Sequence, residues 1–501
     1  MGMKEKMFVD IMATQPEVTG SCNLLIVKYP DKTTTRFIVD CGLFQEKDYS
    51  KYNKEFPFDG KNIDFALITH NHVDHIGRLP LLLKKGFTGP IYASEATCKF
   101  MPYALYDSYK VLKDLAKRNH EPQLYSEANV SETCHKLIPC TFRQNITIDD
   151  HITVTFIKNG HLVGAALILV QIKYPGCKER NILFTGDWSN KNMFFTVPKI
   201  PEWIRKLPIT IVQESTYGTT ESSETDAMSG TFERNLIDCI SNNGTFISMV
   251  FSLGRAQEIL YILKCMQKNG ELSKDIPIYF DGKLAQQYTR LYKTQDLGID
   301  GRMFDFLPEN LIMVGREDRE SIIESSDSKV IVTTSGMGTY GPAQVYIPSY
   351  ITRENCTLHF TGYTAEGTLG EKLKSAKMGE MVNISGLICK KRAKVEYTTE
   401  FSAHAKADEM VEFLKQFEDL RMVLVNHGEA ETKLKFSERI AEEVNPANVA
   451  ILNRDYCFRI GPYGLIRTLP TKFEWFQFYF KVSKGKTKLR FVFYIRTLIF
   501  F

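Results

Sequence analysis

The sequence of 501 residues contains 11 cysteines but no CxxC pair. An odd number of scattered cysteines argues against a disulfide framework, and the missing CxxC spacing argues against a structural zinc site built from cysteines. We therefore expect reduced, mostly buried thiols.

Segments that would direct the chain to a membrane are also missing. The first residues, MGMKEKM, lack the apolar core of a signal peptide, and no run approaches the roughly 18 apolar residues of a membrane span. We expect a cytoplasmic protein with no membrane partner. The excess of positive charge is small, at +4, which permits an anionic partner without requiring one.

The densest group of chemically active side chains lies in the stretch THNHVDHIG, residues 69–77. His70, His72, Asp74 and His75 follow directly after the apolar run Phe65 to Ile68, which predicts a buried strand. Residues two apart in extended backbone point to one side, so His70 and His72 can bind one metal ion and the pair beyond the bend a second. The HExxH pattern differs, because it needs helical spacing for a single zinc. The stretch predicts a metal site at the end of a strand.

Other candidate ligands follow apolar runs in a similar way. Asp40 ends a run that begins at Thr35, Asp187 follows Gly186 after another run, and His161 stands between glycines. Up to about residue 208 the order of elements predicts an α/β sandwich whose two sheets deliver ligands to one edge.

From residue 209 strands and helices alternate regularly, beginning with a strand from Ile209 to Gln213. This alternation predicts a parallel, doubly wound sheet with ligands at the carboxyl ends of its strands, one of which carries Glu214. Candidate ligands occur both before residue 190 and after residue 400, so the block reads as an insertion into one metal-binding domain. We predict a divided domain over 1–208 and 391–465, an insertion over 209–390, and an unassigned tail over 466–501.

The tail is rich in aromatic residues with basic residues between them. Such interleaving can bind single-stranded nucleic acid. The alternation of Leu489, Phe491, Phe493 and Ile495 favours instead an edge strand or a contact between two copies in a homodimer.

Taken together, these stretches resemble the metallo-β-lactamase superfamily and, within it, the β-CASP branch of nucleic-acid-processing nucleases. Asp40, the HxHxDH of 70–75, His161 and Asp187 are similar to the four metal-site motifs of the superfamily, in order. Three stretches are similar to the β-CASP motifs A, B and C: Glu214 in ESTYG, His404 in FSAHA and His427 in NHGE. The resemblance covers roughly residues 8–465. It implies a metallo-β-lactamase αββα sandwich with an inserted β-CASP domain.

The resemblance also implies a metal-dependent ribonuclease. A histidine at motif C, here His427, resembles the members that act on RNA, among them the cleavage and polyadenylation endonuclease and its bacterial single-chain relatives. The implied reaction is hydrolysis of phosphodiester bonds, with endonucleolytic processing of single-stranded RNA as the expectation. The implied cofactors are two Zn²⁺ ions, with Mn²⁺ as the alternative.

The ligand scheme of the family assigns a role to each candidate residue. One ion falls to His70, His72 and His161, the other to Asp74, His75 and His427, with Asp187 bridging them. The carboxylates of Asp74 and Asp187 offset the charge of the ions. His404, oriented and kept protonated by Glu214, is the expected acid for the leaving ribose oxygen. We expect Asp40 to orient ligands rather than to bind metal.

One position departs from the family pattern. Lys406 stands two residues after His404, where an acid is common. Two alternative functions also stay open. The first is a non-catalytic RNA-binding scaffold of the same fold, although every ligand is present in this chain. The second is a metallo-hydrolase for small esters or thioesters, which leaves the insertion with Glu214 and the additional His404 unexplained.

Overall fold

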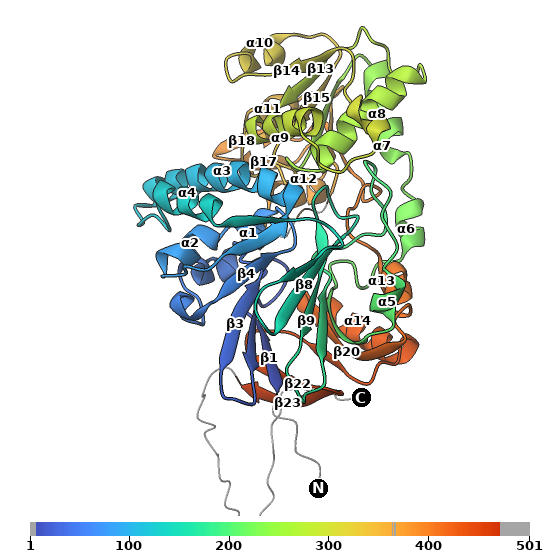
Figure 1. Cartoon of the computed structure of the whole chain (residues 1–501). Helices are drawn as coiled ribbons and strands as arrows, with labels where there is room; N and C mark the ends of the chain where they lie inside the picture. The colour runs from blue at the N-terminus through green and yellow to red at the C-terminus, as the bar shows by residue number, and fades with distance from the viewer. Residues whose placement is uncertain (1–6, 363, 365–366, 471–501) are drawn as a thin grey trace, which may run out of the picture.

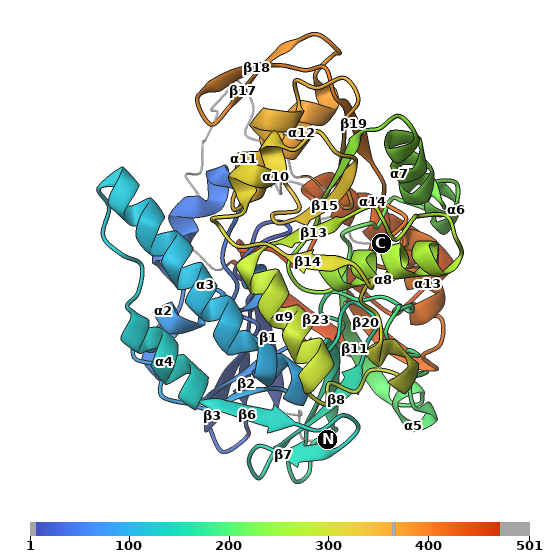
Figure 2. The ribbon, with the colours of Figure 1, turned by 90° about the horizontal axis from the view of Figure 1, so that it is seen from above.

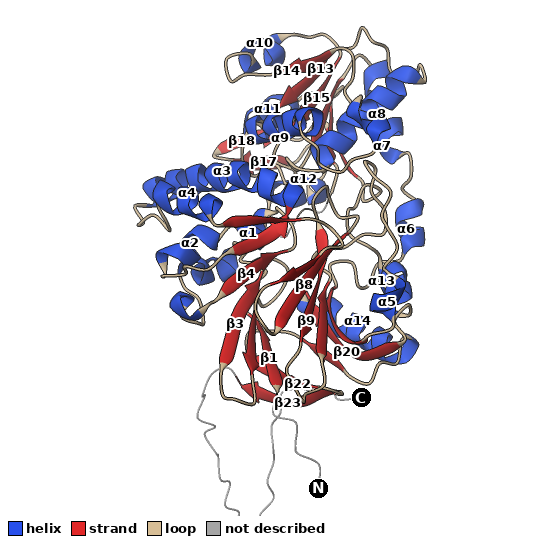
Figure 3. Ribbon diagram, viewed as in Figure 1, coloured by secondary structure: helices blue, strands red, loops and turns tan. Residues whose placement is uncertain are grey.

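The computed structural model describes residues 7–362, 364 and 367–470. Within these residues the strands form sheets of eight, seven and six strands and one two-stranded hairpin. The two larger sheets face each other in the lower part of Figure 1, and the six-stranded sheet with its own helices lies above them. Figure 3 shows the same division by secondary structure, with helices on the outer sides of the paired sheets.

The eight-stranded sheet is mixed. In spatial order its strands are β23 (Gly464–Pro470), β22 (Tyr456–Gly461), β1 (Phe8–Ala13), β2 (Asn23–Lys28), β3 (Thr34–Val39), β4 (Phe65–Ile68), β5 (Ile91–Ser94) and β6 (Leu137–Cys140). Pairing is antiparallel from β23 to β3 and parallel from β3 to β6. The carboxyl ends of β3 and β4 therefore meet at one edge.

The seven-stranded sheet brings together segments that are far apart in sequence. In spatial order its strands are β21 (Val449–Ile451), β20 (Asp419–Asn426), β11 (Pro208–Glu214), β10 (Arg180–Phe184), β9 (Ala166–Ile172), β8 (Ile152–Lys158) and β7 (Asn145–Thr147). Its inner face shares one apolar core with the first sheet, in which Val39 and Leu67 pack with Phe184 and Leu424. The two sheets therefore form a sandwich.

Helices cover both outer faces of the sandwich. On the eight-stranded sheet lie α1 (Val73–Ile76), α2 (Leu79–Lys84), α3 (Glu95–Asn119) and α4 (Glu127–His135), and on the seven-stranded sheet α5 (Glu202–Arg205), α13 (Ala407–Leu414) and α14 (Ala430–Glu443). β5, which contains Tyr92, leads directly into α3. The side chain of Ser94 accepts a hydrogen bond from Thr97 N, and this cap starts the helix at Glu95.

The six-stranded sheet is parallel throughout. In spatial order its strands are β14 (Leu311–Met313), β13 (Ile278–Asp281), β15 (Lys329–Thr333), β12 (Thr245–Met249), β16 (Thr357–Phe360) and β19 (Lys394–Tyr397). Its helices are α7 (Thr231–Ser241), α8 (Arg255–Lys268), α9 (Lys283–Thr294), α10 (Arg319–Glu324), α11 (Ala343–Tyr350) and α12 (Leu369–Ser375), and the hairpin is β17 (Met381–Ile384) with β18 (Leu387–Lys390). The short helix α6 (Ser222–Asp226) contacts α13 of the sandwich instead. The predicted α/β fold, an αββα sandwich with an inserted parallel sheet, is confirmed.

Two strands near the limits of the insertion lie in other sheets than the alternation predicts. We expected Ile209 to Gln213 to open the inserted sheet, but β11 pairs with β10 and β20 of the sandwich. Conversely β19, beyond residue 390, pairs with β16 of the inserted sheet. Local alternation identifies a strand but not its partner, because β11 and its partner β20 are separated in sequence by the whole insertion.

The tail is described only at its beginning. Residues as far as Pro470 belong to β23, whereas the predicted edge strand or dimer contact at 489–495 lies outside the described residues. In the part of the chain that the structure describes, no helix is both long and apolar enough to cross a membrane.

Candidate metal centre

The candidate ligands lie where strands of both sheets end. β4 ends at Ile68, and the next residues carry His70 and His72 before α1 begins at Val73. β10 ends three residues before Asp187, and β20 ends one residue before His427. His427 has a positive φ of 49°, so the backbone turns sharply at this ligand. The sandwich thereby brings residues from the two ends of the chain to one edge.

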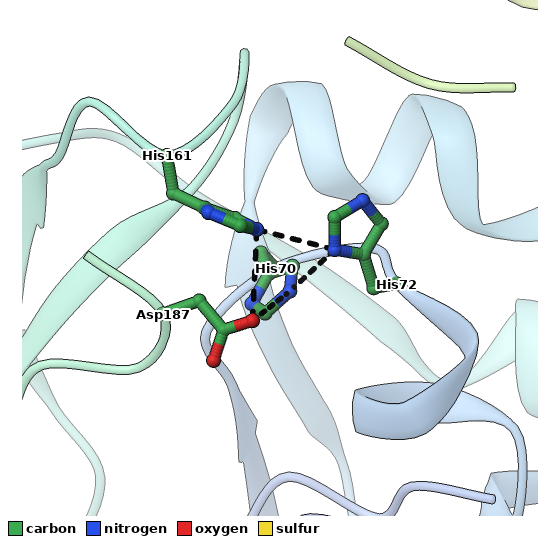
Figure 4. A group of neighbouring side chains, drawn as sticks. All are labelled: His70, His72, His161 and Asp187. Carbon is green, nitrogen blue, oxygen red and sulfur yellow. Dashed lines mark hydrogen bonds and ion pairs between the residues drawn. The ribbon is translucent and has the colours of Figure 1, made fainter. Parts of the chain in front are cut away.

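Three histidines and an aspartate form the first ligand group. One atom each of His70, His72, His161 and Asp187 lies within 4.8 Å of all the others (Figure 4). Nδ1 of His72 is 3.1 Å from Nε2 of His70 and 3.1 Å from Nε2 of His161. Of the four residues, His70, His161 and Asp187 are buried. Nitrogen and oxygen atoms that converge in this way are a donor set for a divalent metal ion.

The second group consists of Asp74, His75 and His427. Nε2 of His75 is 3.1 Å from Nε2 of His427, and Oδ2 of Asp74 lies 3.8 Å from each of these nitrogens. His75 and His427 are buried, whereas the side chain of Asp74 is partly exposed. This group therefore faces the solvent on the side of Asp74.

The carboxylate of Asp187 lies between the two groups. Its Oδ2 is 3.5 Å from Nε2 of His70 and 3.6 Å from Nε2 of His161. Its Oδ1 is 3.2 Å from Nε2 of His75 and 3.3 Å from Nε2 of His427. Oδ1 is nevertheless buried without an aligned hydrogen-bond donor among the described residues. A buried carboxylate oxygen that is surrounded by ring nitrogens but not hydrogen-bonded suits the binding of a metal ion together with those nitrogens, because the ion would supply the missing partner.

Two histidines of the first group are oriented by contacts of the ring nitrogen that faces away from the other ligands. Nδ1 of His161 donates to the carbonyl oxygen of Ala403 at 2.9 Å, and Nδ1 of His70 lies 3.1 Å from Oγ1 of Thr69. The Thr69 hydroxyl in turn donates to Asp40 Oδ2 at 2.8 Å. Each such bond fixes which ring nitrogen remains free for a metal ion.

The histidines of the second group are oriented in the same manner. Nδ1 of His75 donates to Asp40 Oδ2 at 2.8 Å, and Nδ1 of His427 lies 3.1 Å from Oγ1 of Thr216. Asp40 itself lies outside both ligand groups, but it holds the ring of His75, which carries a candidate ligand atom. Its place is the one expected of an orienting residue.

Burial sets the protonation states of the first group. It holds the pKa of His70 and of His161 well below the ordinary value and lowers that of His72 to about 4. These rings are therefore neutral near pH 7, the form that binds metal ions. Burial alone would raise the pKa of Asp187, but His427 and His75 hold it well below its ordinary value, so this carboxylate is ionised.

His404 and Glu214 form a pair beside the first group. Nδ1 of His404 donates to both carboxylate oxygens of Glu214, at 3.0 Å each, while Nε2 points toward Asp187 Oδ2 at 3.9 Å. Glu214 is itself held by Trp188 N at 2.6 Å. Burial opposes protonation of His404, but the Glu214 carboxylate outweighs it and raises the pKa. A protonated His404 therefore carries its second N–H at Nε2, which faces Asp187.

Lys406, which departs from the family pattern, does not hydrogen-bond to His404. Its Nζ is buried 3.6 Å from the ring centroid of Tyr217 and has no hydrogen-bond partner among the described residues. Burial lowers the pKa of Lys406 to about 8. The Tyr217 ring lies next to that of His404, with centroids 6.0 Å apart. The charge of Lys406 nevertheless acts on His404 and lowers its pKa, against the larger effect of Glu214.

Asn159 contacts the loops of two candidate ligands, although no motif in the sequence marks it as a functional residue. Its Oδ1 accepts from His161 N at 2.8 Å, and its Nδ2 donates to the carbonyl oxygen of Asp187 at 3.0 Å. It thus joins the loops that carry two ligands from different strands. The available signal was its position two residues before His161, inside the same glycine-containing turn.

Three family models match successive parts of the chain. "Metallo-beta-lactamase superfamily" matches residues 18–199, "Beta-Casp domain" residues 256–373 and "Zn-dependent metallo-hydrolase RNA specificity domain" residues 389–451. With the sandwich and the histidine and aspartate groups, these matches define a metal-dependent hydrolase with a divalent metal site. The chain therefore carries metallo-β-lactamase and β-CASP domains, which confirms the resemblance to this family.

Relatives that match most of the chain carry related names. "Ribonuclease TTHA0252" of Thermus thermophilus is 29% identical over 85% of this chain and 94% of its own length. "Transcription termination factor FttA" of Methanosarcina mazei is 27% identical over 87% of this chain and 69% of its own. "Integrator complex subunit 11" of Danio rerio is 27% identical over 82% and 69%.

Proposed function

We propose that this chain is a ribonuclease that hydrolyses phosphodiester bonds of single-stranded RNA with two bound Zn²⁺ ions, or Mn²⁺ in their place. The observation that carries the proposal is the position of Asp187 between two ligand groups and beside the His404–Glu214 pair. The name of the Thermus relative and the match to an RNA specificity domain at 389–451 support RNA as the substrate.

In the proposed centre His70, His72 and His161 hold one ion, while Asp74, His75 and His427 hold the other. Asp187 turns one carboxylate oxygen toward each ligand group and so serves both. Neutral imidazoles and carboxylates are the ligands that Zn²⁺ binds in catalytic sites, and carboxylates also suit Mn²⁺. Bound divalent ions would polarise the phosphodiester and lower the pKa of an attacking water molecule.

The protein itself supplies the proton for the leaving group. The ribose oxygen that leaves would otherwise depart as an alkoxide, so an acid within reach accelerates cleavage. Nε2 of His404 faces the centre, and Glu214 holds the other ring nitrogen and stabilises the charged ring. Asp74 and Asp187 are proposed to offset the charge of the ions, leaving a modest positive charge for the phosphate.

Burial supports an unpaired strand as substrate. The side chain of His404 exposes 19% of its surface and that of Asp187 exposes 3%. A flexible single strand can bring one phosphate to such a recessed site, whereas a stiff duplex presents its phosphates on a broad surface. Endonucleolytic cleavage remains part of the proposal.

The test is cleavage of labelled RNA by the purified chain, with DNA of the same sequence and a chelator as controls. Metal-dependent cleavage of the RNA, read by fragment length, supports the proposal and separates internal from terminal cleavage. RNA binding without cleavage would support the scaffold alternative. If the chain neither binds nor cleaves RNA, the alternative of a metallo-hydrolase for small esters or thioesters would be favoured.

A further inference from the structure

A contact from the inserted domain reaches the ligand loop of the sandwich. Asn71 stands between His70 and His72, and its Nδ2 donates a hydrogen bond to the hydroxyl oxygen of Tyr288 on α9 at 3.1 Å. Both side chains are buried, Asn71 to 3% exposure and Tyr288 to 2%. The bond therefore joins a helix of the insertion to the residue that separates two candidate ligands.

We propose that Tyr288 is a positioning residue of the metal centre, through which the inserted domain holds the His70–His72 loop in its ligand geometry. The inference rests on the proposed function, because it assumes that His70 and His72 bind metal. Asn71 belongs to neither ligand group. Its backbone lies between the two ligands, so a shift of this side chain moves both rings.

The helix that carries Tyr288 is well anchored. α9 lies beside α3 in both views of the ribbon (Figures 1 and 2), and the Tyr288 ring meets that of Phe100 on α3 with centroids 5.4 Å apart. One turn along α9, the ring of Tyr292 packs 5.9 Å from Phe100 and 5.1 Å from Phe194. An aromatic cluster with closely packed rings is stiff, which suits an element that positions another.

Further contacts join the same parts of the two domains. Nζ of Lys99 on α3 donates to the carbonyl oxygen of Asp296, just beyond the end of α9, at 2.6 Å. The backbone N of Asp300 donates to the carbonyl oxygen of Phe194 at 2.8 Å. The segment that follows α9 is thus also fixed against the sandwich, close to the Tyr288 contact.

Tyr288 and Tyr292 form a natural pair of test and control. Both lie buried on α9 and both pack against Phe100, but the hydroxyl of Tyr292 has no hydrogen-bond partner among the described residues. Tyr288→Phe keeps the ring and removes the bond to Asn71. Tyr292→Phe removes an equally buried hydroxyl that bonds to nothing described.

The experiment measures metal affinity by competition with a chelator, and kcat and KM on labelled RNA, for the full chain and both variants. Loss of a residue that orients ligands typically weakens metal binding about 10-fold to 100-fold. We expect Tyr288→Phe to weaken it about tenfold and to lower kcat while KM for RNA stays unchanged. Tyr292→Phe should match the wild type in all three quantities.

A second variant separates this role from a general loss of stability. If Tyr288 acts through Asn71, then Tyr288→Phe adds no further loss of metal affinity in an Asn71→Ala background. Suppose that the wild type binds metal and cleaves RNA. The inference would then be overturned by additive losses of metal affinity in that cycle, or by a Tyr288→Phe variant whose metal affinity and kcat equal those of Tyr292→Phe. A wild type that does neither would overturn the proposed function first, and this inference with it.

Discussion

Nδ1 of His404 lies 3.0 Å from each carboxylate oxygen of Glu214, although the two residues stand 190 positions apart. Glu214 ends β11 and lies opposite Asn426 at the end of β20, so the seven-stranded sheet places Glu214 beside His427. His404 lies outside this sheet, in the loop between β19 and α13, and this loop brings its ring to Glu214.

Replacing His404 separates proton donation from metal binding. We expect His404→Ala to slow RNA cleavage about 100-fold to 10,000-fold, the usual contribution of a general acid. Metal content should stay at the wild-type value, because His404 belongs to neither ligand group. Metal analysis and cleavage assays on the same sample measure both quantities. His135→Ala, at an exposed histidine that ends α4, is the matched control. Wild-type cleavage by His404→Ala would remove this residue from the mechanism.

Replacing Asp187 should affect both quantities at once. Asp187→Asn keeps the shape of the side chain but removes the charge that lies between the two ligand groups. We expect metal affinity to fall at least about tenfold, and cleavage to fall with it. Equilibrium dialysis measures the bound metal. Asp305→Asn, at a side chain exposed to 84%, is the control for loss of one acid. Retention of full metal content by Asp187→Asn would refute its bridging role.

Removal of the metal should destabilise the fold. A ligand that binds only the native state stabilises it by about 4 kcal/mol at a concentration 1,000 times its Kd. We therefore expect a chelator to lower the thermal midpoint of the wild type, and added Zn²⁺ to restore it. The midpoint of Asp187→Asn should respond much less to either addition. A wild-type midpoint that ignores both would count against a metal centre built from these groups.

His359 predicts a pH dependence of stability away from the metal centre. It is fully buried on β16 against the rings of Phe232 and Phe246, and neither ring nitrogen has a hydrogen-bond partner among the described residues. Burial lowers the pKa of His359 to about 3. The unfolded chain takes up the proton near pH 6.5, so the stabilisation is present above that pH and is lost as pH falls.

The expected loss between pH 7 and pH 5 is about 2 kcal/mol in the free energy of unfolding. His359→Phe keeps an aromatic ring at the site and should lack this loss. Denaturant unfolding of both proteins at the two pH values, in excess chelator to silence the metal centre, gives the difference. Equal slopes against pH for the two proteins would show that His359 is protonated or hydrogen-bonded in the native state.

Much of the centre is visible in the sequence because several of its residues follow an apolar strand. Asp40, His70, Asp187, Glu214 and His427 all come at or just after the end of a buried strand. The end of a strand can be predicted from the neighbouring residues alone, and the ends of several strands lie together at one edge of a sandwich. The structure brings all the predicted ligands and the His404–Glu214 pair together at that edge.

What the sequence does not reveal is the choice of distant partners. β11 reads as the first strand of the alternating block, yet it pairs with β20 across the whole insertion. Likewise Tyr288 lies on α9, one of the helices of the alternating block. Its hydroxyl meets Asn71, a residue 217 positions away, only after the insertion has packed on α3. Neither contact leaves a periodic signal in the chain.

The nearness of His75 and His427 also bears on the entropy of the unfolded chain. Their ring nitrogens lie 3.1 Å apart although 352 positions separate them. A cation held by both closes a loop that contains the entire inserted domain, and the entropy removed by closing a loop grows with its length. In the proposed enzyme such an ion would therefore also be a reversible cross-link. Its removal would cost the chain both its catalytic group and the stabilisation that comes from closing this loop.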